Sequence, residues 1–582
     1  MKYRWDIAPT QPVLTSVLAP ELKISPLLAQ CLLNRGFSEP ESISRFLQPR
    51  LKHLADPFLI PNMREAVERL FQARAGGERL VLFGDYDVDG VTSVTLLAEV
   101  LRHFGWTVDC YLPHRIEEGY GLSQTAVAKC LDRFPVSLLV AVDCGSTSRE
   151  TIGWLQARGV DTIVLDHHQL ASASSLPPAR ALVNPQLGRS DAPSFRELCS
   201  VGLTFKLTHA IVKHGRSHGL PGALEYDLRP CLDLVALGTV ADLVPLSGEN
   251  RILVQAGLER LGTSQRPGLI ALKRVAAVGR RLSAHQVAFQ LAPRLNAAGR
   301  LETATAAWHL LETKDEQEAN RLASQLDAWN RERQQLEKNI TEQALAAVRE
   351  RSGGQPDAVI VEGNSEWHLG VVGIVASRLL QQYYRPTIVL GSDGSHGADY
   401  RGSGRSIEGF DLAAALRQCD DLLVRHGGHA MAAGLTVRAD QVEGLRTRLN
   451  DLARRTLKPE WLQPALRIDA VVGIEEVNLD RVRELSQLEH TGMGNPPVHL
   501  VLRGVTHARP LQRLGAEKKH AKLWITDGRQ VLEALLWSVG DGPLPVGPST
   551  WPALRRSMNT KEPAPCNSRC WIGPRWVARF GA

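Results

Sequence analysis

Three aspartates alternate directly after a short apolar run, and their spacing is the most chemically informative pattern in the chain. Residues 80–83 are apolar, and Asp85, Asp87 and Asp89 follow them. Carboxylates held this close together repel one another and are costly to bury unless a cation neutralises them. An oxygen-rich site of this kind suits a hard divalent ion such as Mg²⁺ or Mn²⁺.

Two other readings of the same residues are weaker. The spacing matches the start of a calcium EF-hand loop, but the twelfth position of that loop needs a glutamate and is Leu96 in this chain. An EF-hand loop also follows a helix, whereas a buried strand is predicted before Asp85. A solvated acidic turn does not usually follow four apolar residues. Because Val91 to Phe104 has helical spacing, the acids lie where a strand feeds a helix, and α/β sheets bind ligands there. The pattern therefore favours a metal site.

Acidic and imidazole groups recur at the ends of two more predicted strands. Asp143 follows one apolar run, and Asp166, His167 and His168 follow another. If the last three residues stay extended, His167 points away from Asp166 and His168. One histidine would then coordinate metal, while the other would support the site or contact a phosphate.

A fourth segment, residues 232–242, is apolar between Asp233 and Asp242, and we predict that it is also a strand. Asp242 is the preferred ligand because it ends the apolar run, as ligands at strand ends do, and Asp233 is its rival. Four strand ends that converge on one crevice could hold two ions roughly 3.5–4 Å apart, the arrangement that clamps a phosphoryl group during transfer.

These segments resemble the motifs of a known enzyme family. Gly84-Asp85-Tyr86-Asp87-Val88-Asp89-Gly90, Val142-Asp143-Cys144-Gly145 and Asp166-His167-His168 resemble motifs I to III of the DHH phosphoesterase superfamily. Residues 111–121 and 292–300 narrow the resemblance to the RecJ family of single-stranded-DNA exonucleases. Residues 367–378, 402–406 and 427–434 resemble the DHHA1 domain of that family. The likeness extends from about Leu27 to about Gly540.

The resemblance implies roles for the site residues. Many superfamily members have a histidine where this chain has Phe83, and we expect Asp85 to take that coordination role. His168 is expected to contact phosphate or to protonate the leaving group. The expected metal ligands are Asp87, Asp89, Asp143, His167 and Asp242, with Asp85 close behind and Asp233 as the alternative.

A preference for 5′ ends requires a phosphate pocket, which guanidinium forks and hydroxyl groups can form. Partly by similarity to the family, the candidates for this pocket are Arg115, Arg294 or Arg300, Ser403 and Arg405, and His429 in a second glycine-rich segment is expected to contact the DNA strand. Neither glycine-rich segment around Ser403 or His429 completes a dinucleotide-binding or ATP-binding pattern.

The expected fold class is α/β, with two α/β domains (DHH and DHHA1) joined by a long helix around a cleft and followed by a β-rich, OB-like domain. Residues 313–351 contain no Pro or Gly and have helical spacing, so they are predicted to form the connecting helix. The expected divisions are a helical lead-in over 1–75, the DHH domain over 76–310, the connecting helix over 311–351, the DHHA1 domain over 352–458 and the OB-like domain over 459–582.

The sequence after about residue 540 departs from this plan, because it is rich in Pro and Trp and has almost no strand pattern. Residues 558–570 can be back-translated into codons, with synonymous codons chosen freely. Translation of this DNA from the third base of the first codon can then give a sequence similar to the last strand of the family. We hypothesise a frameshift between about Ser538 and Trp551, and the alternative is a divergent tail.

Composition is compatible with this assignment. The net charge of +6 permits a nucleic-acid partner, and the nine scattered cysteines suggest neither a disulfide framework nor a zinc site. No apolar signal core or long apolar run is present, so no membrane association is expected.

The expected function is 5′-to-3′ exonucleolytic hydrolysis of single-stranded DNA with two divalent ions, Mn²⁺ or Mg²⁺, in recombination and repair in the bacterial cytoplasm. By resemblance, the expected partners are single-stranded DNA, a single-strand-binding protein and a DNA helicase. The alternatives are an oligonucleotide or cyclic-dinucleotide phosphodiesterase and a non-catalytic single-strand-binding scaffold.

Overall fold

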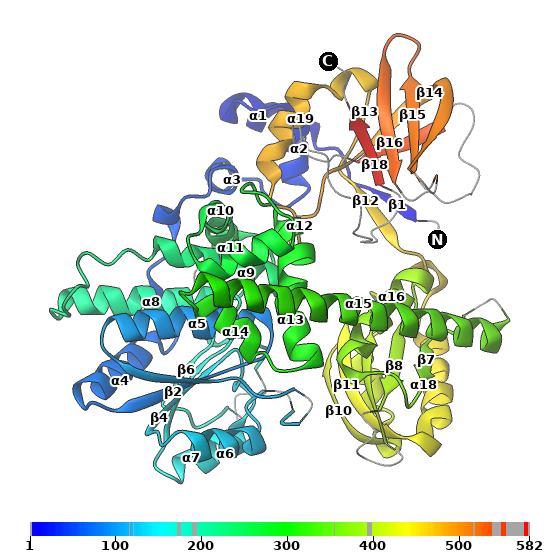
Figure 1. The fold of residues 1–582 in the computed structure, drawn as a ribbon. Helices are drawn as coiled ribbons and strands as arrows, with labels where there is room; N and C mark the ends of the chain where they lie inside the picture. Colours follow the sequence, from blue (N-terminus) through cyan, green and yellow to red (C-terminus); the bar gives the residue numbers. More distant parts are fainter. Residues whose placement is uncertain are drawn as a thin grey trace. The chain divides into compact units, whose positions relative to one another are not determined.

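The computed structural model describes residues 3–115, 117–119, 121–170, 176–188, 195–353, 356–392, 399–515, 518, 520–537, 549–554 and 575–579 (Figure 1). The chain divides into two compact units. The first unit comprises Met1–Asp6, Arg300–Glu302 and Asp327–Leu466, and the second comprises Ile7–Gly299, Thr303–Leu326 and Arg467–Ala582.

The second unit contains a parallel sheet with the strand order β3-β2-β4-β5-β6. Its strands are β2 (Arg79–Gly84), β3 (Thr107–Tyr111), β4 (Leu138–Val142), β5 (Asp161–Leu165) and β6 (Ala181–Val183). All five residues of β4 are buried, as expected for a parallel strand with helices on both sides. Figure 1 shows α6 (Gln124–Arg133) and α7 (Arg149–Gln156) on one side, and α5 (Val88–His103) and α8 (Ser200–Ser217) on the other.

The prediction of a fourth strand over residues 232–242 is wrong, because this segment forms α9 (Leu232–Ala241). A short apolar run does not distinguish a buried strand from a buried helix, and α9 is buried on all sides among other helices. The helices after it are α10 (Gly248–Thr263), α11 (Pro267–Val275), α12 (Ala284–Gln286), α13 (Ala292–Leu301) and α14 (Thr305–Glu312).

The N-terminal region begins with a strand that the sequence did not predict, β1 (Arg4–Ile7), and continues as helices. Pro12 and Pro26 stand at the first turns of α1 and α2, so they begin these helices instead of breaking them. The helices are α1 (Pro12–Leu22), α2 (Pro26–Leu33), α3 (Pro40–Leu47) and α4 (Met63–Ala75).

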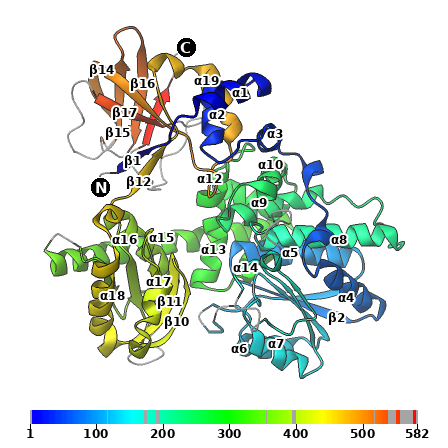
Figure 2. The same ribbon diagram turned by 180° about the vertical axis from the view of Figure 1, so that it is seen from behind.

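The C-terminal part of the second unit is a mainly antiparallel sheet with the order β13-β14-β15-β16-β18, in which β17 also pairs with β14 (Figures 1 and 2). Its buried face shares one hydrophobic core with α2, which includes Leu28, Leu32, Leu500 and Leu523. The elements are β13 (Ala470–Val472), α19 (Leu479–Leu485), β14 (His499–Leu514), β15 (His520–Thr526), β16 (Val531–Trp537), β17 (Ser549–Leu554) and β18 (Arg575–Arg579). Most of the segment for which we hypothesise a frameshift lies outside the described residues.

The first unit contains a second sheet, with the order β10-β11-β9-β8-β7. The predicted long helix is present as the 37-residue α15 (Glu316–Ser352), most of which belongs to this unit. The strands are β7 (Ile360–Gly363), β8 (Thr387–Gly391), β9 (Asp399–Arg405), β10 (Leu423–His429) and β11 (Ala432–Arg438). The other long helices are α16 (Leu369–Tyr383) and α18 (Val442–Thr456), with the short α17 (Leu412–Arg417) between the strands.

Among the described residues, no single helix is long and apolar enough to cross a membrane. The pair α1 and α2 passes this test only together, and the two helices are bent by 117°.

Candidate metal centre

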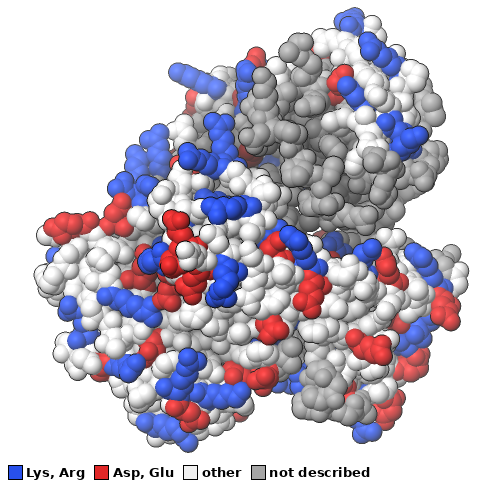
Figure 3. All heavy atoms as spheres, viewed as in Figure 1, with Lys and Arg blue, Asp and Glu red and all other residues white. Residues whose placement is uncertain are grey.

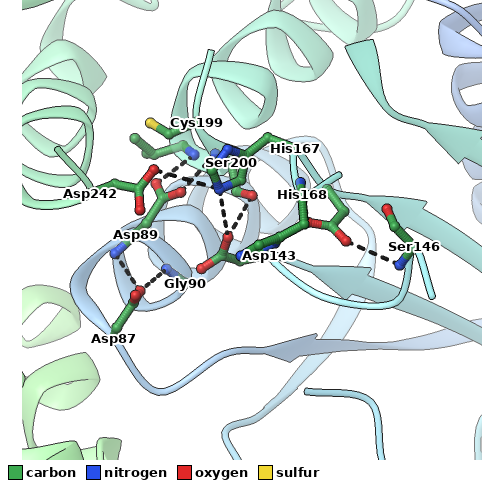
Figure 4. Close-up of polar contacts among 12 residues, drawn as sticks. Asp87, Asp89, Gly90, Asp143, Ser146, His167, His168, Cys199, Ser200 and Asp242 are labelled. Atoms are coloured by element: carbon green, nitrogen blue, oxygen red, sulfur yellow. Dashed lines mark hydrogen bonds and ion pairs between the residues drawn. The ribbon is translucent and has the colours of Figure 1, made fainter. Parts of the chain in front are cut away.

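The predicted acids and histidines of the second unit gather at the carboxyl ends of β2, β4 and β5 and at the end of α9 (Figure 4). Their oxygen and nitrogen atoms form three groups, and the atoms of each group lie within 4.8 Å of one another. The groups are Asp85, Asp87 and Asp143; Asp89, His167 and Asp242; and Asp143, His167 and His168.

The aspartates of the first motif are held by the turn that joins β2 to α5. The Asp87 carboxylate accepts from the N–H groups of Asp89 and Gly90 at 2.9 and 3.1 Å, so it caps α5. A Cβ at Gly90 would lie 2.4 Å from the carbonyl oxygen of Asp85, so the tight turn requires glycine. Because Asp87 caps the helix, α5 begins at Val88, earlier than the sequence predicted.

The start of α8 supports two of the acids. The carboxylate of Asp89 accepts from the N–H groups of Ser200 and Val201 at 2.7 and 2.8 Å, where the helix dipole favours negative charge. The Ser200 hydroxyl donates to Asp143 Oδ1 at 2.8 Å. Asp143 itself has a left-handed backbone conformation, with φ of 63°, which is a strained state that functional sites often retain.

The two histidines point in different directions, as the alternation of an extended segment predicts. Nε2 of His167 lies 3.6 Å from Asp143 Oδ1 and 3.5 Å from Asp242 Oδ2. Nδ1 of His168 instead lies 2.7 Å from Asp166 Oδ1, and the other carboxylate oxygen of Asp166 accepts from the N–H of Ser146 at 3.0 Å.

Burial and mutual repulsion raise the pKa values of the clustered acids. Burial, followed by the charge of Asp87, raises the pKa of Asp85 to about 8 and that of Asp89 to about 7. Burial, followed by the charge of Asp89, raises the pKa of Asp242 to about 9 and that of Asp143 well above its usual range. The protein alone therefore does not compensate these negative charges.

The histidine pKa values move in opposite directions. Burial, followed by the charge of His168, lowers the pKa of His167 to about 4, so its ring is neutral and can act as a ligand. Burial alone would lower the pKa of His168, because it disfavours the charged ring. The hydrogen bond and charge of Asp166 outweigh burial and raise this pKa to about 9. Asp166 is buried too, and the hydrogen bond from His168 nevertheless lowers its pKa.

Three ligand-type atoms in this cluster fit a divalent cation. Asp85 Oδ1, His167 Nε2 and Asp242 Oδ2 are buried and have no hydrogen-bond partner in the described part of the chain. An unsatisfied buried polar atom costs about 1–3 kcal/mol, and more when it is charged. Because carboxylate oxygens suit Mn²⁺ and Mg²⁺ and a neutral imidazole is a common metal ligand, a cation would remove this penalty.

The stability of the metal-free protein should fall as the pH rises from 6.5 to 9. In this window the folded state keeps protons on Asp85, Asp89, Asp242 and His168 that the unfolded chain has released, and it loses them as their folded pKa values are passed. Each such proton lowers the free energy of unfolding by about 1.4 kcal/mol for each pH unit. Thermal unfolding in chelator measures the slope. Saturating Mn²⁺ should displace the protons from the acids and flatten the curve, and an identical slope with Mn²⁺ would contradict the site.

The structure places Asp233 away from the cluster that contains Asp242. The two residues stand at opposite ends of α9, about 13 Å apart at 1.5 Å per residue. Asp233 accepts from the Ser264 hydroxyl at 2.7 Å and forms an ion pair with Arg266 at 3.1 Å, so its charge is already compensated.

The predicted phosphate-binding residues are divided between the two units. In the second unit, Arg115 lies 5.0 Å from the ring centre of Tyr86, next to the first motif. Arg294 on α13 donates to the carbonyl of Gln290. In the first unit, Arg405 on β9 donates to the Ser403 hydroxyl at 2.9 Å, Arg300 donates to the carbonyl of Gly370 at 3.0 Å, and His429 is exposed at the end of β10.

Several residues that support the site were not predicted. The first is Ser200, for which the sequence offers no spacing signal. The second is Asn296 on α13, whose Oδ1 accepts from the N–H of Val88 at 3.1 Å. The third is the fully buried Asn184, which follows β6 and donates to the Ser146 hydroxyl and to the carbonyl of His168 at 2.9 and 3.0 Å. Its place after an apolar run is the same signal that identified Asp143.

Ser200→Ala should slow the expected cleavage of single-stranded DNA about 10–100-fold. A loss of this size is typical when a group that orients a metal ligand is removed. The substitution removes the hydroxyl bonded to Asp143 but keeps the N–H bonded to Asp89. The Mn²⁺ concentration for half-maximal activity should rise. Ser217→Ala, at the exposed end of the same helix, is the matched control and should leave both values unchanged. Equal behaviour of the two variants would argue against a role for Ser200.

Comparison with known proteins agrees with this geometry. The DHH family N-terminal domain matches residues 79–239, the DHHA1 domain matches 357–455, and the RecJ OB domain matches 468–550. The single-stranded-DNA-specific exonuclease RecJ of Bacillus subtilis is 39% identical over 542 residues, which cover 93% of this chain and 66% of that protein. The RecJ exonuclease of Escherichia coli is 34% identical over 531 residues, which cover 89% of this chain and 90% of that protein.

Solved structures of RecJ from Thermus thermophilus have the same fold. The complex with Mn²⁺ matches with a TM-score of 0.79 and 30% identity, covering 99% of this chain and 78% of that one. The complex with Mg²⁺ matches with a TM-score of 0.73 and 29% identity, covering 99% of this chain and 77% of that one. These matches confirm the predicted α/β class with DHH, DHHA1 and OB domains. They also agree with the expectation of Mn²⁺ or Mg²⁺ as the cofactor. The chain belongs to the RecJ family of single-stranded-DNA-specific exonucleases.

Proposed function

We propose that this protein hydrolyses single-stranded DNA from the 5′ end, one nucleotide at a time, with two divalent metal ions. The observation that carries the proposal is the buried cluster at the ends of β2, β4, β5 and α9, in which Asp85 Oδ1, His167 Nε2 and Asp242 Oδ2 have no hydrogen-bond partner among the described residues. Neutral sites for sugars or cofactors do not need so many carboxylates in so small a volume.

The clustering suggests how two ions would be held. Asp85, Asp87 and Asp143 would hold one ion, and Asp89, His167 and Asp242 would hold the other. Asp143 Oδ1 lies near both sets, because it is 3.6 Å from His167 Nε2. Such ions, when bound, supply a hydroxide nucleophile at neutral pH and neutralise the charge of the phosphate and the leaving oxygen.

The chain supplies the remaining chemistry through His168. Asp166 keeps this ring protonated, and Asn184 fixes its backbone by donating to its carbonyl. The His168 side chain is 37% exposed, so it is accessible to substrate. We assign it the role of neutralising the scissile phosphate and giving a proton to the leaving 3′-oxygen.

We further propose that guanidinium and hydroxyl groups recognise the 5′ phosphate. The candidates are Arg115, Arg294 or Arg300, Ser403 and Arg405, and we propose that His429 contacts the DNA strand. The face in Figure 3 carries Lys and Arg interspersed with Asp and Glu rather than one basic surface. Specific phosphate contacts are therefore expected to contribute more to binding than the modest net charge of +6.

The test is digestion of a 5′-phosphorylated single strand in Mn²⁺ or Mg²⁺, with the label at either the 5′ or the 3′ end. The proposal expects immediate release of labelled mononucleotide from the 5′-labelled strand and gradual shortening of the 3′-labelled strand, with little digestion of blunt duplex. Cleavage of dinucleotides but not long strands would favour an oligonucleotide phosphodiesterase. Binding without cleavage under every metal condition would favour a scaffold.

The cellular setting is proposed by family membership. We propose that the protein acts in recombination and repair in the bacterial cytoplasm, with a single-strand-binding protein and a helicase that supply its substrate. Stimulation of digestion by these two proteins on a partly duplex substrate is the direct test.

We also propose that the chain consists of a helical lead-in (1–75), a DHH domain (76–310), a connecting helix (311–351), a DHHA1 domain (352–458) and an OB-like domain (459–582), with a frameshift between about Ser538 and Trp551. The match to the RecJ OB domain ends at residue 550, close to the proposed position. Resequencing of the 3′ end of the gene tests this point, and an unchanged reading frame would remove it.

A further inference from the structure

A glycine-rich loop from the C-terminal region contacts the turn that follows Asp242. Asp242 is the C-cap of α9, and α10 begins at Gly248, so a short turn joins the two helices. The N–H of Leu246 in this turn donates to the carbonyl of Met493 at 2.8 Å. Residues distant in the sequence therefore meet four residues after Asp242 along the chain.

The loop approaches the turn more closely than side chains would allow. A Cβ at Gly494 would lie 2.8 Å from Pro245 Cβ, and a Cβ at Gly492 would lie 2.9 Å from Leu246 Cδ1. Gly494 also has a φ of +70°, which favours glycine. Gly492 and Asn495 close the loop by exchanging N–H···O bonds of 2.9 and 3.2 Å. We call residues 492–495 the glycine loop.

Buried polar contacts fix the glycine loop from its other side. Asn495 is fully buried, and its amide donates to the carbonyls of Leu488 and His490 at 2.7 and 2.8 Å. Its Oδ1 accepts from Arg35 Nε at 3.1 Å, and Arg35 forms a buried ion pair with Asp469 at 2.9 Å. A buried network whose hydrogen bonds are all satisfied is rigid, so it holds the glycine loop in a fixed position against the turn.

The turn is also linked to the segment that supports the other acids. Asn250 on α10 donates to the carbonyls of Pro245 and Glu197. Glu197 lies just before Ser200, which bonds to Asp89 and Asp143. The turn after Asp242 is therefore linked to the segment whose Ser200 supports Asp89 and Asp143.

We propose that the glycine loop positions Asp242 for metal binding, so that the OB region takes part in assembling the catalytic centre. The inference rests on the proposed role of Asp242 as a metal ligand. Leu243, directly after Asp242, has a left-handed φ of 61° and is 62% exposed. A non-glycine residue keeps this conformation only where its surroundings enforce it, and the contact of the loop with Pro245 and Leu246 provides that constraint.

The test compares Gly494→Ala with Gly504→Ala in the full chain. Both glycines have nearly the same positive φ, +70° and +69°, but a Cβ at Gly504 would have no atom within 4 Å. The backbone penalty is therefore matched, and only Gly494→Ala disturbs the turn. Mn²⁺ binding is measured by calorimetry and by electron paramagnetic resonance, with thermal unfolding in parallel. We expect Gly494→Ala to weaken Mn²⁺ binding at one site about 10-fold or more and Gly504→Ala to bind as the wild type does.

Two further variants make the result decisive. Gly492→Ala has an ordinary φ and meets only the flexible end of Leu246, so it should fold and weaken Mn²⁺ binding by a smaller factor. Equal Mn²⁺ affinity in all the glycine variants, with loss in Asp242→Ala, would overturn the positioning role alone. Wild-type affinity in Asp242→Ala would instead refute the ligand assignment on which the inference rests.

Discussion

Asp143→Asn is expected to reduce cleavage of single-stranded DNA about 1000-fold or more while it stabilises the metal-free protein. Asp143 is near both proposed ion sites, and loss of about 4 kcal/mol of transition-state stabilisation corresponds to this factor. Asparagine tolerates the left-handed backbone conformation at this position and can still accept from the Ser200 hydroxyl. The substitution therefore removes a charge with little change of shape.

The gain in stability follows from the repulsion among the buried acids, which raises the pKa of Asp143 well above its usual range. Thermal unfolding in chelator at pH 8 should give a higher melting temperature for Asp143→Asn than for the wild type, and added Mn²⁺ should stabilise the variant less. Asp132→Asn, at an exposed position on α6, is the control and should change neither property. Substantial cleavage by Asp143→Asn would contradict the two-ion assignment.

His168→Ala is expected to slow cleavage about 100–1000-fold without weakening Mn²⁺ binding. The expected factor is that of a lost general acid, because we assign His168 a proton for the leaving oxygen and not a metal bond. Single-turnover cleavage at saturating DNA and Mn²⁺ measures the loss, and calorimetry measures the binding. The matched comparison is His167→Ala, which should weaken Mn²⁺ binding as well, since His167 Nε2 lies between Asp143 and Asp242.

The pH dependence distinguishes a proton donor from a structural residue. The Asp166 carboxylate raises the pKa of His168 and so favours its charged form, and the rate should therefore fall on the alkaline side as this ring loses its proton. Asp166→Asn removes the charge that stabilises the imidazolium, so the same fall should occur at lower pH. If the cleavage rate of Asp166→Asn fell at the same alkaline pH as that of the wild type, His168 would be ruled out as the titrating group.

The sequence could predict most of the candidate metal centre because many of its residues follow strand ends. Asp85, Asp143 and His167 each follow a short apolar run, and the carboxyl ends of parallel strands meet at one edge of a sheet. Proximity in space then follows from topology, without knowledge of the side-chain contacts. The likeness to a family added the order of the motifs and the DHHA1 and OB regions.

What the sequence could not predict depends on packing between distant segments. The run before Asp242 is apolar on all sides, so its pattern fits a buried strand and a buried helix equally well. The Ser200 and Asn296 side chains act through single hydrogen bonds, and such bonds produce no periodic pattern in the sequence. The glycine loop consists of turn-forming residues, and only its contact with Pro245 and Leu246 distinguishes it from an ordinary surface turn.

The uninterrupted course of α15 has a practical consequence for dissecting the protein. The two compact units meet in sequence between Leu326 and Asp327, in the interior of this helix. A truncation at that point would expose four N–H groups without acceptors and would leave a frayed end on each fragment. Recombinant fragments should therefore keep Glu316–Ser352 whole on one side, and mild protease digestion should not cut at this boundary.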